Sequence, residues 1–334
     1  MAPGDPYWTV VHDDAVLAEL KLTATQRKSV RAILDPLDLR GFPLRNKAAA
    51  EANEGFAKLA TEAKAQLAKV LRPQQAERLE QIGVRAQGTE ALLRNEIAAK
   101  LKLTDKQRAE IRETVRRTRE EKAKVQKELL AAKIETARFN QENERLNTAQ
   151  RDAINGLLTA DQKGRLPALL GENFDTSRLG NTRFKAPDIV GDSAAWLNSP
   201  PIPTESLRGR VVVVHFFAFG CINCIHNYPT YREWQEELAG KDVQLIGIHS
   251  PETKSEHNVE TLKSKLKAEE LRFPVIVDNE LANWNAWGNG MWPSVYILDK
   301  QGYLRTFWPG ELKWQGATGD QQMLKKIESL LAEG

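Results

Sequence analysis

The residues best suited to chemistry are two cysteines, Cys221 and Cys224, separated by Ile222 and Asn223. Two thiols at this spacing can cycle between a dithiol and a disulfide, but they also suit half of a zinc site or two ordinary buried side chains. The chain has no other cysteine, which excludes a framework of structural disulfides and a four-cysteine zinc site. We therefore expect no metal, and no cofactor beyond a redox-active Cys221–Cys224 disulfide.

The segments on either side of the cysteines favour redox chemistry. Residues 211–217 form a continuous apolar run typical of a buried strand, and a helical stretch extends from the cysteines to Leu238. A thiol at a helix N-terminus lies at the positive end of the helix dipole, which lowers its pKa from ~8.5 to between ~3.5 and ~7.5. Cys221 is then the nucleophile, and Cys224, one helical turn later and more buried, resolves the mixed disulfide.

The rest of the C-terminal half alternates between strand and helix. Further strands are predicted at 243–248, 273–277 and 294–298, and helices at 259–270 and 323–332. Thioredoxins have the same order of elements: a strand, a Cys-x-x-Cys pair, a helix, a second strand and helix, and then a hairpin and a closing helix. This half of the chain therefore resembles the thioredoxin fold.

Two prolines lie where the thioredoxin family has them. Pro229 follows Cys224 by five residues, inside the predicted helix, and Trp292-Pro293 directly precedes the strand at 294–298. In thioredoxin-like proteins a cis-proline occupies this second place and faces the cysteines. The resemblance implies that the Trp292–Pro293 bond is cis and that the backbone beside it holds the substrate chain like an added strand.

The motif at residues 218–224 resembles the TlpA-like extracytoplasmic thioredoxins, especially the DipZ type, and the resemblance covers residues 184–330. It implies a thiol-disulfide oxidoreductase that acts on protein thiols and disulfides and exchanges electrons with an upstream thiol donor or acceptor. Gly220, Ile222 and Asn223 then flank the active sulfurs. The implied location is periplasmic or secreted, with a signal peptide, absent from this sequence, removed.

Two departures from thioredoxin affect the mechanism. His215 stands where thioredoxin has a buried Asp that helps move the proton. A histidine that titrates near neutral pH could take that role, and a neutral buried histidine hydrogen-bonded to backbone is the alternative. The dipeptide between the cysteines is Ile-Asn rather than Gly-Pro, so the direction of electron flow stays open.

Composition divides the chain near residue 180. Residues 1–180 hold 32 Lys and Arg against 26 Asp and Glu, whereas the remainder holds 16 against 19 and carries seven of the eight tryptophans. The predicted fold class is an all-α long-helix domain (1–180) followed by a thioredoxin-like α/β domain (181–334). Prolines in residues 181–209 suggest a linker or irregular lead-in.

The N-terminal half repeats a Leu-Thr-x-x-Gln motif at Leu22–Gln26, Leu103–Gln107 and Leu158–Gln162, with a degenerate copy at Leu71–Gln75. The pattern is a capping box, in which Thr and Gln bond to each other's backbone N–H at a helix start. Neither Gly nor Pro occurs between Asp105 and Asn155, which predicts a long helical hairpin. This half resembles the LTxxQ family of Spy and CpxP, which implies binding of unfolded client proteins.

Other function classes fit less well. The net charge is only +3, no basic residues cluster, and no apolar run reaches the ~20 residues of a membrane span, so neither nucleic acid nor a transmembrane segment is expected. A non-enzymatic periplasmic chaperone with an auxiliary redox domain stays open, as does a thiol peroxidase. Peroxiredoxins carry Pro-x-x-x-Thr-x-x-Cys, however, and here Val214 and Ala218 occupy the Pro and Thr places.

Overall fold

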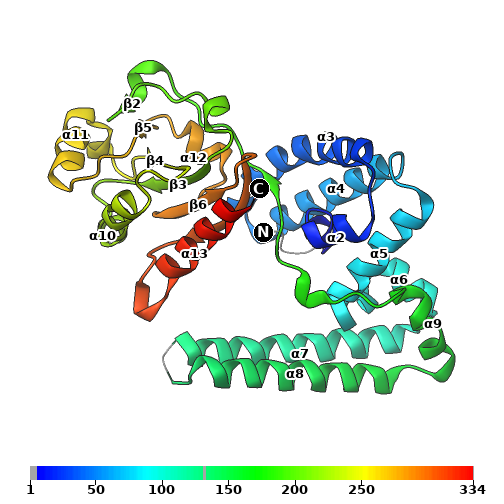
Figure 1. Ribbon diagram of the computed structural model, residues 1–334. Helices are drawn as coiled ribbons and strands as arrows, with labels where there is room; N and C mark the ends of the chain where they lie inside the picture. The colour runs from blue at the N-terminus through cyan, green and yellow to red at the C-terminus, as the bar shows by residue number, and fades with distance from the viewer. Residues whose placement is uncertain (1–5, 131–132, 334) are drawn as a thin grey trace. The chain divides into compact units, whose positions relative to one another are not determined.

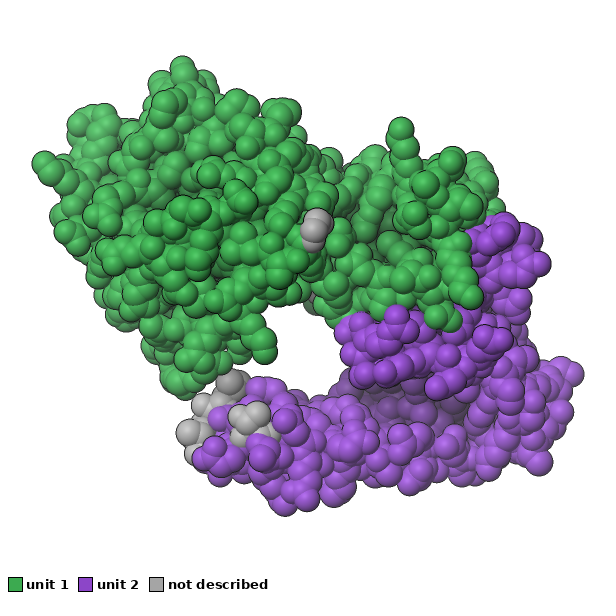
Figure 2. All heavy atoms as spheres, viewed as in Figure 1, with its two compact units in different colours: residues 1–71, 180–334 green, residues 72–179 purple. Residues whose placement is uncertain are grey.

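The computed structural model describes residues 6–130 and 133–333. It has the predicted fold class, an all-α region followed by an α/β region (Figure 1). Its contacts separate two compact units, unit 1 (Met1–Leu71 with Gly180–Gly334) and unit 2 (Arg72–Leu179), coloured in Figure 2. The change in composition near residue 180 thus coincides with the end of unit 2. Residues up to Leu71, however, pack with the C-terminal half rather than with the rest of the helical region.

The described residues of unit 1 form one mixed sheet in the order β1-β7-β6-β3-β4-β5-β2. The strands are β1 (Phe184–Lys185), β2 (Trp196–Leu197), β3 (Val211–Phe217), β4 (Val243–His249), β5 (Val275–Val277), β6 (Ser294–Leu298) and β7 (Tyr303–Pro309). The central strands β3, β4 and β5 run parallel, and β6 runs antiparallel to β3. The parallel pairs need crossover connections, which helices supply.

The helices of unit 1 are α1 (Pro6–Val10), α2 (Asp14–Glu19), α3 (Ala24–Gly41), α4 (Ala49–Leu67), α10 (Ile222–Glu237), α11 (Val259–Ala268), α12 (Ala282–Ala286) and α13 (Gly319–Ala332), with a 3-10 turn, η1 (Phe42–Asn46), between α3 and α4. Side chains alternate across β3. Val213 and Phe217 pack in one core cluster with residues of α10, α11 and α13. Phe216 points to the other face, where its ring meets Trp284 and Trp287.

The segment expected as a linker contributes both edge strands of the sheet. β1 pairs with β7, and β2 pairs with β5. None of the prolines of this segment lies inside a strand: Pro187 falls between β1 and β2, and the other three follow β2, since a proline cannot donate a ladder hydrogen bond. Residues 181–209 are therefore built into the α/β fold.

The N-terminal helices are joined to this sheet by buried polar contacts. The His12 imidazole lies 2.7 Å from Asp38, and both side chains are completely buried. The second carboxylate oxygen of Asp38 accepts the backbone N–H of Lys185 in β1 at 2.8 Å, and the His12 ring stacks on Phe184. A buried carboxylate needs such partners to offset its lost hydration, which explains why these helices pack on this edge strand.

Among its described residues, unit 2 contains helices and no strand. It contains α5 (Pro73–Gln87), α6 (Asn95–Leu101), α7 (Asp105–Leu130), α8 (Thr136–Leu157) and α9 (Ala160–Leu170). The long helices α7 and α8 form the predicted antiparallel hairpin (Figure 1). Its buried stripe is narrow, with Ile111, Val115 and Ile154 in the core of the unit. Within the described part of the chain, none of the helices combines the length and apolar character needed to cross a bilayer.

The Leu-Thr-x-x-Gln motifs form capping boxes. Thr23 with Gln26 starts α3, and Thr159 with Gln162 starts α9. Thr104 and Gln107 exchange the same two bonds at the start of α7. In the degenerate copy, Gln75 accepts the backbone N–H of Arg72. Each motif therefore fixes where a helix begins.

Candidate active site

Cys221 lies between the end of β3 and the start of α10. The buried strand ends at Phe217, a short turn follows, and Cys221 is the N-cap residue of the helix. Cys221 is partly exposed, whereas Cys224 is completely buried. The backbone N–H of Cys224 donates to the Cys221 carbonyl at 3.0 Å, which holds the two residues in the first turn of the helix.

The surroundings of Cys221 favour its thiolate. A hydrogen bond from the Cys224 thiol, together with the backbone N–H groups of Cys224 and Asn223, lowers the pKa of Cys221 to about 7. Partial burial and the carboxylate of Glu252 act in the opposite direction. The result matches the effect expected of a helix N-terminus, and a large fraction of Cys221 is ionised near neutral pH.

Cys224 has the opposite properties. Burial raises its pKa far above the ordinary value, and the neighbouring Cys221 adds to the shift. Its sulfur is the acceptor of one weak contact, from the backbone N–H of Ala218 at 3.5 Å. A protonated, buried thiol next to an exposed thiolate is the arrangement that thiol-disulfide exchange requires of a resolving cysteine.

A buried carboxylate that sequence reasoning missed supports the turn before Cys221. Glu256 is 3% exposed and accepts the backbone N–H of Gly220 at 2.7 Å. Its other oxygen accepts the backbone N–H groups of Glu252 and Thr253. A Cβ on Gly220 would lie 2.8 Å from the Glu256 carboxylate, so a larger residue there would displace the carboxylate. The signal was present as a Thr253-x-x-Glu256 capping box.

The peptide bond between Trp292 and Pro293 is cis. Ser294, the next residue, pairs with Phe216 of β3, so the proline lies at the same end of the sheet as the turn to Cys221. Pro293 is buried and Trp292 is partly exposed. The Trp292 indole donates to the Ser250 carbonyl at 2.8 Å and stacks on Trp284 at 3.9 Å, which fixes the side chain beside the proline.

His215 does not behave as a neutral-pH proton carrier. Its ring is completely buried among Phe217, Tyr231 and Phe273. Burial lowers its pKa to about 3, so the imidazole is uncharged at neutral pH. Neither ring nitrogen has a hydrogen-bond partner in the described part of the chain, which also departs from the alternative of a backbone-bonded histidine. Its place in an aromatic cluster gives it a packing role.

Comparison with known proteins agrees with this geometry. The AhpC/TSA family model matches residues 184–307. The C-terminal part of the chain is a thioredoxin-like domain of this family. Protein DipZ of Mycobacterium bovis is 34% identical over 129 residues, which are 38% of this chain and 18% of that protein. The chain therefore spans about a fifth of the length of its DipZ relative.

Two shorter relatives match over almost their whole length. Thiol-disulfide oxidoreductase YkuV of Bacillus subtilis is 24% identical over 151 residues, 45% of this chain and 97% of that protein. The crystal structure of a thiol-disulfide isomerase from Corynebacterium glutamicum is 27% identical, with a TM-score of 0.38, over 45% of this chain and 98% of that one. The resemblance of the N-terminal half to the LTxxQ family stays a prediction.

Residues near the sulfur pair differ in exposure. Gly220, Ile222 and Asn223 are exposed around Cys221, and Ile222 has 59% of its surface accessible. His226 is exposed and pairs with Glu311 at 3.0 Å. His249 is buried, with its ring stacked on Phe219. The sulfur pair is therefore surrounded by an accessible rim with an aromatic interior below it.

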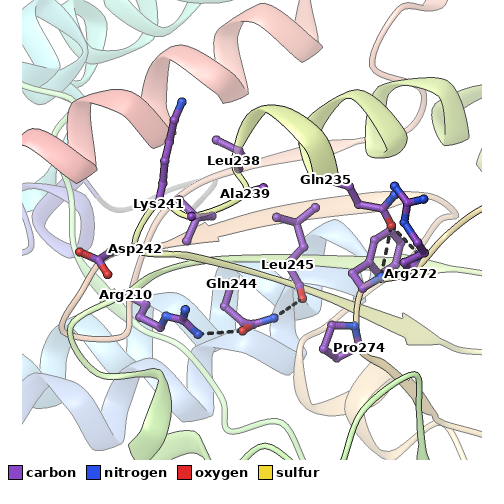
Figure 3. Close-up of a pocket in the computed structure, with 13 residues that line it drawn as sticks. Arg210, Gln235, Leu238, Ala239, Lys241, Asp242, Gln244, Leu245, Arg272 and Pro274 are labelled. Atoms are coloured by element: carbon purple, nitrogen blue, oxygen red, sulfur yellow. Dashed lines mark hydrogen bonds between the residues drawn. The ribbon is translucent and has the colours of Figure 1, made fainter.

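A hollow of about 390 Å³ at the far end of the thioredoxin-like domain is separate from this site (Figure 3). It is lined by the segment that joins α10 to β4 and by the residues before β5. Arg210 donates to Gln244, and Gln235 accepts the backbone N–H groups of Arg272 and Phe273 (Figure 3). These residues precede the parallel strands, whereas Cys221 follows one, so the hollow lies at the opposite end of the sheet.

Proposed function

We propose that the thioredoxin-like domain exchanges disulfides with protein clients through Cys221 and Cys224. One observation carries the proposal: a partly exposed thiol with a pKa of about 7 is hydrogen-bonded to a buried, protonated thiol one helical turn away. Nothing else in the described residues combines an accessible nucleophile with a second group able to complete its reaction. The chemistry needs no metal or organic cofactor.

The reaction proceeds in two balanced exchanges. The Cys221 thiolate attacks one sulfur of a client disulfide, forms a mixed disulfide and releases the other client sulfur as a thiolate, which takes a proton from water. Cys224 then loses its proton to solvent and attacks the Cys221 sulfur, which releases the second client thiolate and leaves a Cys221–Cys224 disulfide. An upstream thiol donor restores the dithiol. The reverse sequence oxidises clients, so the partner's potential decides the direction.

The residues around the sulfurs position the client in this proposal. The backbone at Trp292 and Pro293 pairs with the client chain as an added strand. Gly220, Ile222 and Asn223 form the exposed rim that the client crosses. Client disulfides form and persist in oxidising compartments, where few competing thiols reduce them. This agrees with a periplasmic or secreted location.

The helical region belongs, in this proposal, to the LTxxQ family and binds unfolded clients for the redox domain. The capping boxes support the motif assignment. Suppression of client aggregation by the chain with both cysteines replaced tests the binding role separately from redox chemistry. If that variant leaves the aggregation of the client unchanged, the proposed binding role is contradicted.

Insulin reduction with dithiothreitol as electron donor tests the redox proposal. Cys221→Ser is expected to abolish turnover. Cys224→Ser, mixed with insulin before dithiothreitol is added, is expected to accumulate a mixed disulfide that dithiothreitol then releases. His226→Ala, an exposed change on the same helix, serves as the matched control. Insulin turnover that persists in Cys221→Ser would contradict the proposal. Peroxide consumption that survives Cys224→Ser would instead favour the thiol peroxidase.

A further inference from the structure

A second hollow lies on the other face of the sheet from α10. Its volume is about 450 Å³, within the ~300–1,000 Å³ typical of ligand pockets. Phe56 of α4 lines one side, and Tyr296 of β6 and Phe307 of β7 line another. Its lining is mainly aromatic and apolar, which suits a large apolar side chain.

The hollow is continuous in the chain with the proposed client-binding loop. Met291 lines it, is 50% exposed, and is followed directly by Trp292 and the cis-proline. Adjacent Cα atoms are ~3.8 Å apart, so the hollow begins within one residue of the backbone that would pair with a client. An extended client chain advances only ~3.3 Å per residue. A client residue close in sequence to the reacting cysteine therefore lies over the hollow.

The same wall retains a hydrogen-bond donor. Asn289 is 1% exposed; its side-chain oxygen accepts the Tyr296 hydroxyl at 2.6 Å, and its backbone oxygen accepts the Asn46 amide. Its side-chain nitrogen has no partner among the residues that the structure describes. A buried donor without a partner costs free energy, and a peptide carbonyl is the acceptor that an extended client brings.

Arg45 holds the aromatic wall in place. Its guanidinium lies 4.3 Å from the centre of the Phe307 ring and 5.2 Å from that of Tyr296, and it donates to the Trp287 carbonyl. These contacts hold the guanidinium against the rings and the backbone, and the other side chains of the lining carry no charge. The chemistry of the walls therefore favours an uncharged apolar group.

We propose that this hollow is a specificity subsite that receives a large apolar side chain of the client, close in sequence to the client's reacting cysteine. The inference rests on the proposed function. It assigns residues of η1 and α4, which lie outside the matched family domain, a role in choosing clients. Because side chains of an extended chain alternate, the preference falls on one position and not on its immediate neighbours.

The first test uses the unmodified protein. Peptides with one cysteine, carried as a mixed disulfide with thionitrobenzoate, are varied between Phe and Gly at each of three positions before and after the cysteine. Attack by Cys221 on the peptide sulfur releases coloured thionitrobenzoate. We expect the second-order rate constant to rise about fivefold or more with Phe at one position, since burying an aromatic side chain is favourable. Equal rates at all positions would overturn the proposal.

The second test fills or charges the hollow. Ala52 of α4 lines it and Ala57 of the same helix is exposed, so Ala52→Leu should reduce the Phe-to-Gly rate ratio toward one while Ala57→Leu keeps it. Met291→Glu, at a half-exposed position that folding tolerates, should reduce the ratio as well. A ratio that survives both Ala52→Leu, if folded, and Met291→Glu would overturn the subsite.

The outcomes separate this inference from the proposed function. If Cys221→Ser releases thionitrobenzoate as fast as the unmodified chain, the redox proposal fails and the subsite with it. If release needs Cys221 but shows no side-chain preference, only the subsite fails. If a second copy of this chain fills the hollow, the molar mass in solution would rise with protein concentration and the peptides would show no preference for Phe. That outcome would also overturn the subsite.

Discussion

The reactivity of Cys221 is a balance between hydrogen-bond donors and a nearby carboxylate. The Cys224 thiol and two backbone N–H groups stabilise the thiolate, whereas partial burial and Glu252 disfavour it. Because the donors come from the first helical turn, they are fixed by the fold. The Glu252 side chain is exposed, so its contribution can be removed without disturbing the core.

We expect the rate at which iodoacetamide modifies Cys221 to rise with pH through a midpoint near 7, because only the thiolate reacts. Glu252→Gln removes a negative charge that raises this pKa, so its midpoint should lie lower by a fraction of a unit, and less at high salt. Glu260→Gln, on a residue paired with Lys263, is the matched control. A midpoint that rises in Glu252→Gln would contradict the electrostatic assignment.

The Glu256 carboxylate should matter for both stability and reactivity. Glu256→Ala leaves three backbone N–H groups near the active turn without their acceptor, and unmet buried donors cost about 1–3 kcal/mol. We expect urea unfolding, followed by tryptophan fluorescence, to show a loss of this size. The alkylation rate of Cys221 should also change, because Gly220 is released. Glu256→Gln keeps an acceptor and should be milder.

Single residues were predictable where the signal was local. The Cys-x-x-Cys pair between a buried strand and a helix indicated the order of burial of its two thiols, because strand, turn and helix start are all visible in one short stretch. His215 was not predictable, since the rings that bury it come from Tyr231 and Phe273, far along the chain. The contact between Glu256 and Gly220 was missed for the same reason.

At the level of elements, the Leu-Thr-x-x-Gln motif does more than start helices. Gln107 donates to the carbonyl of Leu157 at 2.8 Å, and Gln162 donates to the carbonyl of Lys102 at 3.2 Å. The two side-chain amides also contact each other. Each glutamine thus satisfies a carbonyl just before the partner motif, which ties the start of α7 to the start of α9. The capping box was predictable from sequence, but this pairing between copies was not.

This pairing predicts a coupling between the two glutamines. Gln107→Ala and Gln162→Ala should each lower the free energy of unfolding by about 1–2 kcal/mol, since each loses a cap and a cross-helix bond. The double variant should lose less than the sum of the singles, by about 0.5 kcal/mol or more. Urea unfolding followed by circular dichroism measures all three. Additive losses would show that the copies act as independent caps.

For the whole molecule, the first 71 residues complete the α/β unit. Besides the His12–Asp38–Lys185 contact, the rings of Phe42 and Trp287 form a T-shaped pair with centres 6.0 Å apart, and the Tyr303 hydroxyl donates to Asp35 at 2.9 Å. Composition placed these helices with the rest of the helical region, because helix-forming residues look alike wherever they pack. These helices belong with the sheet because their side chains are buried against residues far along the chain, and composition contains no information about such contacts.

This assignment predicts that the segment 181–334 is less stable alone than within the full chain. Removal of residues 1–180 exposes the faces of Trp287 and Phe184 that Phe42 and His12 cover, and burial of one large apolar side chain is worth about 1.5–3 kcal/mol. Seven of the eight tryptophans lie after residue 180, so fluorescence follows this unit in both chains. A chain that keeps residues 1–71, joined to residues 180–334 by a flexible linker in place of residues 72–179, should recover most of the loss. If segment 181–334 unfolds at the same urea concentration as the full chain, the N-terminal helices are not part of its folding unit, and the boundary at residue 180 stands.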